Sequence, residues 1–109
     1  MSELKQLQEQ VLKFRDERDW AQFHNSKDLA MNLSIEAGEL MELFLWKTAA
    51  EADVSKISDE LDDVLMSVLL IAKNHEIDLA KALVDKLERT AKKYPVERSR
   101  GKNQKYTEL

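Results

Sequence analysis

Four acidic residues occur as two pairs with the same spacing. Glu36 and Glu39 stand in the sequence Glu-Ala-Gly-Glu, and Glu60 and Asp63 stand in Glu-Leu-Asp-Asp. On a helix, residues three apart lie on one face, about one turn from each other. If two such helices pack face to face, the four carboxylates converge, and two like charges ~5 Å apart at an effective dielectric near 20 repel by roughly 3 kcal/mol. The pattern therefore indicates a site that binds a cation.

The types of ligand narrow the identity of the cation. Oxygen ligands favour Mg²⁺, Mn²⁺ or Ca²⁺, and the absence of cysteine excludes thiolate metal sites, disulfides and cysteine nucleophiles. Di-iron four-helix bundles need a Glu-x-x-His motif on each of two helices. Here the second member of each pair is Glu39 or Asp63, and the two histidines, His24 and His75, lie elsewhere.

Ordinary solvated helix carboxylates are the alternative interpretation, because charged pairs at this spacing are common on helix surfaces. Glu36 argues against it, since Leu33 and Leu40 stand one turn away on either side. Glu36 therefore falls within the apolar stripe of its helix rather than on the solvated face.

The elements that must position these carboxylates are helices. The chain has 109 residues with only 2 glycines and 1 proline, too few turn residues for a β-sheet protein. Apolar spacing and capping residues predict four helices: one capped by Ser2 and ending near Arg18, one from the cap Ser26 to about Lys47, one capped by Ser55 from Lys56 to about His75, and one capped by Asp78 from Leu79 to about Lys93. Pro95 disfavours a helical residue before it. We expect an all-α fold with a four-helix bundle protomer, a single domain over residues 1–109 and a polar C-terminal tail over residues 96–109.

The helix that carries Glu60 and Asp63 gives a reason to expect an oligomer. Its second half is apolar around most of its circumference, and such a helix is usually buried on all sides. Four short helices cannot bury it easily, so a partner subunit is expected. The residues concerned are Leu65, Met66, Val68, Leu69, Leu70 and Ile71.

Charge and targeting features limit the partners. A net charge of −4 argues against binding to a nucleic-acid backbone, which depends on basic patches. The N-terminus lacks the apolar stretch of a signal peptide, and no run reaches membrane-spanning length. We therefore expect a cytoplasmic protein with neither a nucleic acid nor a membrane as its partner.

Other candidate residues are less specific. Trp20, Phe23 and Trp46 could stack a nucleobase, although lone aromatic residues more often belong to a core or an interface. His24 could contact a ligand, and Lys86 lies on a basic stripe that would otherwise be a solvated helix face. No glycine-rich phosphate loop is present, so any triphosphate would be held by metal ions and basic side chains.

Together these motifs resemble the MazG-like all-α nucleoside triphosphate pyrophosphohydrolases, especially their dCTP pyrophosphatase branch. Residues 14–24, Phe-Arg-Asp-Glu-Arg-Asp-Trp through Phe23-His24, are similar to the entry segment of that branch. Its Glu-x-x-Glu and Glu-x-x-Asp motifs match Glu36, Glu39, Glu60 and Asp63. Further matches follow in the expected order: Glu42-Leu43-Phe44 with Trp46-Lys47, Asp78-Leu79, Lys86, Tyr94-Pro95-Val96, Gly101 and Lys105-Tyr106.

The resemblance implies a homotetramer, or at least a tight dimer, of four-helix protomers. It implies Mg²⁺, with Mn²⁺ as a substitute, on the four acidic residues, and water attack that splits a nucleoside triphosphate into monophosphate and pyrophosphate. Three positions depart from the branch: Thr90 replaces its usual Asn, while Ser67 and Asn74 stand where it can carry Tyr and Arg. The residues expected to bind substrate are Trp20, His24, Trp46, Lys86, Thr90 and Tyr94.

The predicted function is therefore removal of surplus or non-standard nucleotides, with dCTP or a related deoxynucleotide as substrate. We expect one carboxylate, Glu36 as the most core-embedded, to position water as general base. The alternative is a non-catalytic helical oligomerisation module whose acidic residues bind a structural divalent metal.

Overall fold

The computed structural model describes residues 2–109, and every regular element among them is helical. The expected all-α class is confirmed. The longer helices are α1 (Glu3–Glu17), α2 (Ser26–Glu42), α3 (Val54–Asn74) and α4 (Leu79–Lys93), and α5 (Val96–Ser99) adds one short turn of helix. Short 3₁₀ segments are η1 (Ala21–Phe23), η2 (Ala49–Glu51) and η3 (Tyr106–Glu108). No helix in the described part of the chain is both long and apolar enough to span a bilayer.

The chain forms two compact units, one ending at Ile77 and the other comprising Asp78–Leu109. The first unit contains α1, α2 and α3, and the second contains α4, α5 and η3. Assembly of all four long helices into one bundle, and one domain over residues 1–109, remain predictions.

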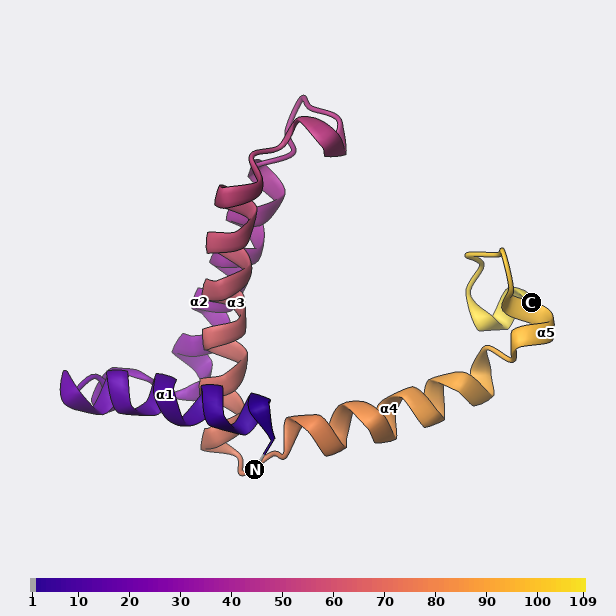
Figure 1. The fold of residues 1–109 in the computed structure, drawn as a ribbon. Coiled ribbons are helices and arrows are strands. Elements are labelled where there is room, and N and C mark those ends of the chain that lie inside the picture. The colour runs from indigo at the N-terminus through magenta and orange to yellow at the C-terminus, as the bar shows by residue number, and fades with distance from the viewer. Residues whose placement is uncertain (1) are drawn as a thin grey trace. The chain divides into compact units, whose positions relative to one another are not determined.

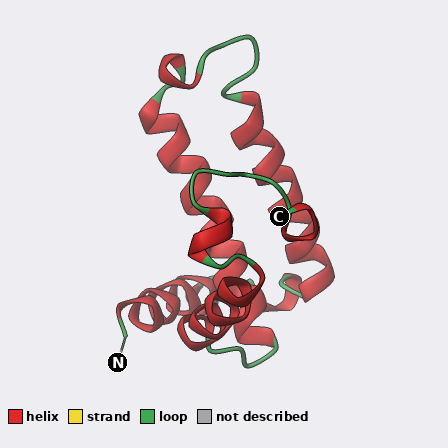
Figure 2. Cartoon of the chain, turned by 90° about the vertical axis from the view of Figure 1, so that its right-hand side faces the viewer, coloured by secondary structure: helices red, strands yellow, loops and turns green. Residues whose placement is uncertain are grey.

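In the first unit, α2 and α3 form a helical hairpin. They lie side by side along their length, and residues 43–53 connect them (Figures 1 and 2). α1 crosses α3 near the end of the hairpin away from that connection, and the Gln8 side-chain amide of α1 donates to the backbone carbonyl of Leu69 at 2.9 Å. The fully buried residues of α3, Ser67, Leu69, Leu70 and Ala72, lie in its second half.

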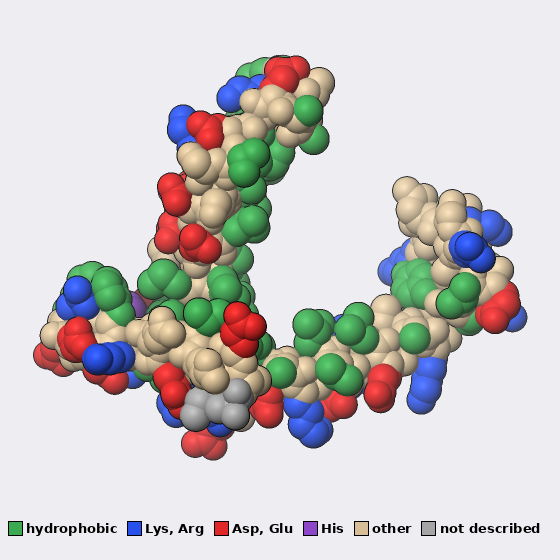
Figure 3. All heavy atoms as spheres, in the orientation of Figure 1, with side chains coloured by type: hydrophobic (Ala, Val, Ile, Leu, Met, Phe, Trp, Pro, Cys, Tyr) green, Lys and Arg blue, Asp and Glu red, His purple; other side chains and the backbone are tan. Residues whose placement is uncertain are grey.

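This packing corrects part of the expectation that the apolar second half of α3 needs a partner subunit to bury it. Leu69 is only 2% exposed and Leu70 only 4% exposed within the single chain. Part of the second half of α3 is therefore buried without a partner subunit, because α1 and α2 both pack on it, whereas Leu65 and Met66 remain 39% and 37% exposed. Large apolar side chains nevertheless remain exposed along the α2–α3 pair, including Met31, Ile35, Met41, Leu45, Leu61 and Leu65 (Figure 3).

Two of the four predicted helix caps agree with the structure and two do not. Ser2 and Asp78 cap α1 and α4, and α4 ends before Tyr94-Pro95 as expected. α2 is capped by Asn25 rather than Ser26, because the Asn25 side chain accepts the Asp28 N–H at 2.9 Å.

α3 begins earlier than expected, because Asp53 rather than Ser55 is its cap. The Asp53 carboxylate accepts the Ser55 N–H at 2.9 Å, and this bond lowers the pKa of Asp53. α2 stops at Glu42 rather than near Lys47, because the next amides bond three residues back and Trp46 adopts a positive φ of 61°.

α3 ends in a left-handed residue that is not glycine. Glu76 has φ 53°, its N–H donates to the Lys73 carbonyl at 3.2 Å, and the Ile77 N–H donates to the Ala72 carbonyl at 2.9 Å. This pair of bonds forms a Schellman motif, in which glycine is the residue of lowest strain.

We expect Glu76→Gly to raise the free energy of unfolding by about 0.5–1 kcal/mol, since relief of ~1–2 kcal/mol of left-handed strain exceeds the entropic cost of glycine. Lys73→Gly, inside the same helix, is the control and should lower stability by about 1 kcal/mol. Urea unfolding of both variants measures the difference. A loss of stability in Glu76→Gly would contradict this account of the helix end.

Candidate metal centre and adjoining cavity

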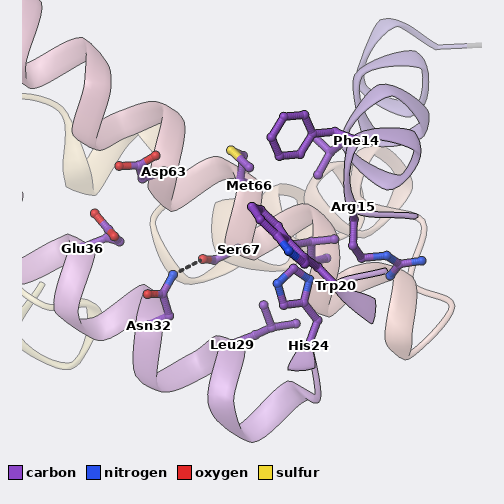
Figure 4. Close-up of a pocket in the computed structure, with 12 residues that line it drawn as sticks. Phe14, Arg15, Trp20, His24, Leu29, Asn32, Glu36, Asp63, Met66 and Ser67 are labelled. Atoms are coloured by element: carbon purple, nitrogen blue, oxygen red, sulfur yellow. Dashed lines mark hydrogen bonds between the residues drawn. The ribbon is translucent and has the colours of Figure 1, made fainter. Parts of the chain in front are cut away.

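Three carboxylates of the hairpin come together. Glu36 lies on α2, Glu60 and Asp63 lie on α3, and one carboxylate oxygen from each lies within 4.8 Å of the others. Figure 4 shows Glu36 and Asp63 extending toward one another from the two helices. The helical spacing places Glu60 and Asp63 on one face, and the hairpin brings that face against α2.

The cluster has the features of a cation site. One oxygen of Glu36 and one of Glu60, Oε2 in each case, are shielded from solvent and have no hydrogen-bond partner. The ion pairs within the described residues, Lys13–Glu17, Arg15–Asp16 and Lys81–Asp85, do not involve any of the three carboxylates. Shielded, unpaired carboxylate oxygens are costly unless a cation compensates them. An all-oxygen ligand set fits Mg²⁺, Mn²⁺ or Ca²⁺.

Mutual repulsion shows in the acidity of Glu36. Its pKa is raised from 4.5 to about 7, first because its protonated form can hydrogen-bond Glu60. Desolvation adds to the shift, followed by the negative charges of Glu39 and Asp63. Glu36 is therefore only partly ionised near neutral pH when no cation is bound.

Glu39 lies at the edge of this group. Its negative charge helps to raise the pKa of Glu36, so its carboxylate lies nearby. It is exposed, however, and is not among the three residues whose oxygens converge. The structure thus brings three of the four expected ligands together, with the fourth beside them.

A cavity of about 180 Å³ opens beside the carboxylates. Glu36 and Asp63 line one part of it, and Trp20 and His24 line another (Figure 4). Its remaining walls come from α1, α2 and α3: Val11, Phe14, Arg15, Leu29, Asn32, Met66, Ser67 and Leu70. One cavity therefore combines an acidic region with an aromatic and apolar region.

The aromatic wall is held by contacts at the end of α1. The rings of Phe14 and Trp20 meet edge to face with centroids 5.7 Å apart, and the Arg18 guanidinium lies 3.7 Å from the Phe14 ring centroid. Trp20 follows Asp19, whose φ of 54° turns the chain out of α1. The positive φ after the helix therefore directs the tryptophan to the cavity.

His24 is the second predicted substrate residue that lines the cavity. Its Nδ1 is shielded from solvent and has no hydrogen-bond partner. The Asn74 side-chain amide fixes this segment by donating to the His24 carbonyl at 2.9 Å and to the Ser26 hydroxyl at 3.2 Å. Asn74 thus has a local structural role at the position noted as a departure from the family pattern.

The remaining predicted residues are not brought to the cavity within the first unit. Trp46 is 99% exposed and does not line it. Lys86, Thr90 and Tyr94 belong to the second unit, where Lys86 is exposed and the other two are half-buried. The Tyr94 ring packs edge to face on Tyr106, with centroids 5.8 Å apart.

Sequence reasoning missed part of the cavity wall. Asn32 lies one helical turn before Glu36, and Ser67 lies one turn after Asp63, so each acidic pair continues as a polar residue on the same face. That continuation was a usable signal. Phe14 and Met66, in contrast, follow the ordinary apolar pattern of a core, and nothing in their spacing marks a cavity.

Comparison with known proteins places this arrangement in context. A model of the MazG-like family matches residues 31–109. The chain is 39% identical to dCTP pyrophosphatase 1 of Rattus norvegicus and 38% identical to the Homo sapiens protein of that name, over 88% of this chain. It spans only 61% of the length of those relatives. A crystal structure of a pyrophosphatase from Archaeoglobus fulgidus superposes with a TM-score of 0.80 at 31% identity, covering 87% of this chain and 94% of that one.

The first prediction from this site concerns metal affinity. Asp63→Asn removes one converging carboxylate and should weaken Mn²⁺ binding by about 10- to 100-fold, because the amide is a poorer ligand for a hard cation. The metal-free variant should be slightly more stable, since one repulsive charge is lost. Calorimetric titration measures the affinity. Asp62→Asn makes the same charge change on an exposed neighbour and should bind Mn²⁺ like the wild type; equal weakening in both variants would contradict a local ligand role for Asp63.

The second prediction concerns pH and the metal-free protein. Because the folded pKa of Glu36 is about 7, above its ordinary 4.5, its contribution to stability is present at low pH and is lost as pH rises through the folded pKa. In a chelating buffer, wild type should therefore lose more stability between about pH 5 and about pH 8 than Glu36→Gln, whose side chain does not titrate. Urea midpoints at the two pH values measure this, and parallel losses in both proteins would exclude a raised pKa.

Proposed function

We propose that this chain, which belongs to the MazG-like family, is a divalent-metal-dependent enzyme that hydrolyses nucleoside triphosphates to the monophosphate and pyrophosphate. One observation carries the proposal: two of the three converging carboxylates, Glu36 and Asp63, line the same cavity as an aromatic wall. A triphosphate substrate needs a cation site for its phosphates and an apolar surface for its base, and this cavity offers both.

Glu36, Glu60 and Asp63 would hold the metal, with Glu39 beside them as a further ligand. Mg²⁺, or Mn²⁺ in its place, would neutralise triphosphate charge there and make water more acidic. The shielded, unpaired oxygens of Glu36 and Glu60 support this role, because a cation would compensate them.

Glu36 would also position the attacking water as general base. A carboxylate within hydrogen-bond reach of a water can accept its proton as the bond to phosphorus forms. The residue lies at the acidic part of the cavity, where the α phosphate would be held close to the carboxylates.

The base would lie against Trp20 and His24. Stacking of a base on an aromatic side chain is worth about 1–3 kcal/mol, and the edge-to-face contact with Phe14 holds Trp20 in place. Trp46, fully exposed in its own chain, would serve the site of a neighbouring subunit.

Lys86, Thr90 and Tyr94 would bind the outer phosphates with cations of the C-terminal tail. Their assignment rests on the family pattern and on the exposed charge of Lys86. Charge on the departing pyrophosphate would be stabilised by such cations.

The substrate would be dCTP or a related deoxynucleotide, because the relatives at 38–39% identity carry the name dCTP pyrophosphatase 1. The enzyme would act on the nucleotide pool of the cytoplasm, without a nucleic acid or a membrane as its partner. The alternative, a non-catalytic module with a structural metal, gives no role to the cavity beside the carboxylates.

The protomers would assemble into a dimer or a tetramer. Apolar side chains are exposed along the α2–α3 pair and, separately, along one face of α4, where Leu83, Val84 and Leu87 are 55–60% exposed (Figure 3). Apolar patches of this extent are usually covered by another surface.

The bond that breaks tests the proposed function. Hydrolysis of dCTP with Mg²⁺ should release dCMP and pyrophosphate in equal amounts, without dCDP, because water attacks the α phosphorus. In ¹⁸O-labelled water the label should appear in dCMP, as mass spectrometry would show. Asp63→Asn should abolish the reaction while Asp62→Asn retains it. Accumulation of dCDP and orthophosphate would refute this reaction.

The assembly prediction uses two lysine substitutions on α4. Leu83→Lys places a charge on the apolar face and should shift the sedimenting species toward the 12.7 kDa protomer, because burying an unpaired charge is expensive. Ala82→Lys adds a lysine on the side of the helix away from Val84 and Leu87 and should leave the oligomer intact. A wild-type protein that sediments as an active 12.7 kDa monomer would contradict the assembly.

A further inference from the structure

Two polar side chains meet in the cavity between the carboxylates and the aromatic wall. Asn32 of α2 donates from Nδ2 to the Ser67 hydroxyl oxygen of α3 at 3.3 Å, and Figure 4 shows this contact between the acidic residues and Trp20. Ser67 is 2% exposed and is the buried polar residue of this core, whereas Asn32 remains accessible from the cavity. A molecule that filled the cavity would contact the Asn32 amide on its way to the carboxylates.

The contact leaves hydrogen-bonding groups for a ligand. A primary amide has two N–H donors and a carbonyl acceptor, and the bond to Ser67 occupies one donor. At 3.3 Å this bond is also longer than the usual 2.7–3.2 Å of a strong N–H···O bond. Asn32 can therefore present one N–H and one C=O to the polar edge of a base.

The pair can also reverse its polarity. Rotation of the Asn32 amide by half a turn exchanges its oxygen and nitrogen, and a serine hydroxyl can donate as readily as it accepts. Ser67 can thus support Asn32 in either orientation. In one orientation the amide complements a base with an amino group beside a ring acceptor, such as cytosine, and in the other it complements a keto group beside a ring N–H, such as uracil.

We propose that Asn32 and Ser67 form the base-reading pair of this cavity, and that their reversible amide–hydroxyl contact admits both amino-bearing and keto-bearing bases. The inference rests on the proposed function and deepens it, since it assigns the substrate class to two residues outside the metal site. A relaxed choice of base suits an enzyme that removes unwanted nucleotides rather than one that serves a single nucleotide.

The matched substrates dCTP and dUTP test the proposal, because they differ only in the group that the pair would read. Wild-type kcat/KM values for the two should agree within about tenfold, whereas a site with fixed polarity discriminates by roughly 10⁴-fold or more. An abasic deoxyribose triphosphate measures binding without a base, through its inhibition constant against dCTP hydrolysis.

Asn32→Ala is the main variant, and it suits the helix because alanine has the highest helix propensity. It should lower kcat/KM for dCTP and for dUTP by about 10- to 100-fold and leave the inhibition constant of the abasic triphosphate within about twofold. Ser67→Ala should lower both kcat/KM values in the same direction by a smaller factor. Ser34→Ala removes an exposed α2 hydroxyl that bonds the Ala30 carbonyl and should change neither.

The outcomes distinguish failure of the base-reading pair from failure of the proposed function. Unchanged kcat/KM values in Asn32→Ala, equal loss of abasic binding, or a wild-type preference above about 10³-fold would overturn the base-reading pair while the proposed function stands. Absence of any deoxynucleotide hydrolysis by the wild type with Mg²⁺ or Mn²⁺ would instead refute the proposed function itself.

Discussion

Repulsion among carboxylates at the α2–α3 seam is the constraint on which the rest of this protein depends. Glu36, Glu60 and Asp63 present oxygens within 4.8 Å of one another, and two of these residues have shielded oxygens without a partner. Protonation of Glu36 is the response available to the metal-free protein, as its raised pKa shows. A bound cation would provide the other response, and this is the reason for proposing a metal site here that would hold an anionic ligand.

The hairpin also explains why acidic, polar and aromatic side chains line one cavity. α2 and α3 supply both the carboxylates and the next polar layer, Asn32 and Ser67, because residues one turn apart occupy the same helix face. α1 and the turn after it close the far wall with Trp20 and His24. A substrate in this cavity would therefore meet charged side chains at one end, polar side chains in the middle and aromatic side chains at the other end.

The exposed apolar side chains are the reason for proposing an oligomer, and this reason is independent of the carboxylate site. The chain buries few side chains completely, Leu29, Ala52, Ser67, Leu69, Leu70 and Ala72 among the described residues. Large apolar side chains remain exposed in both units, and Trp46 at 99% exposure is the extreme case. Hydrophobic burial is the main driving force of association, which is why these surfaces are proposed as interfaces between copies.

The sequence by itself determined the all-helical class, the approximate limits of the four long helices and the acidic pairs, because these depend on local spacing and capping. It could not settle which of Asn25 and Ser26, or Asp53 and Ser55, caps a helix, since neighbouring residues compete for the same amides. Only the tertiary structure decided that Glu39 lies beside the carboxylate cluster, that Trp46 lies outside the cavity and that Asn32 meets Ser67. Those outcomes depend on how far apart two packed helices stand and on where a positive φ turns the chain, which no period in the sequence encodes.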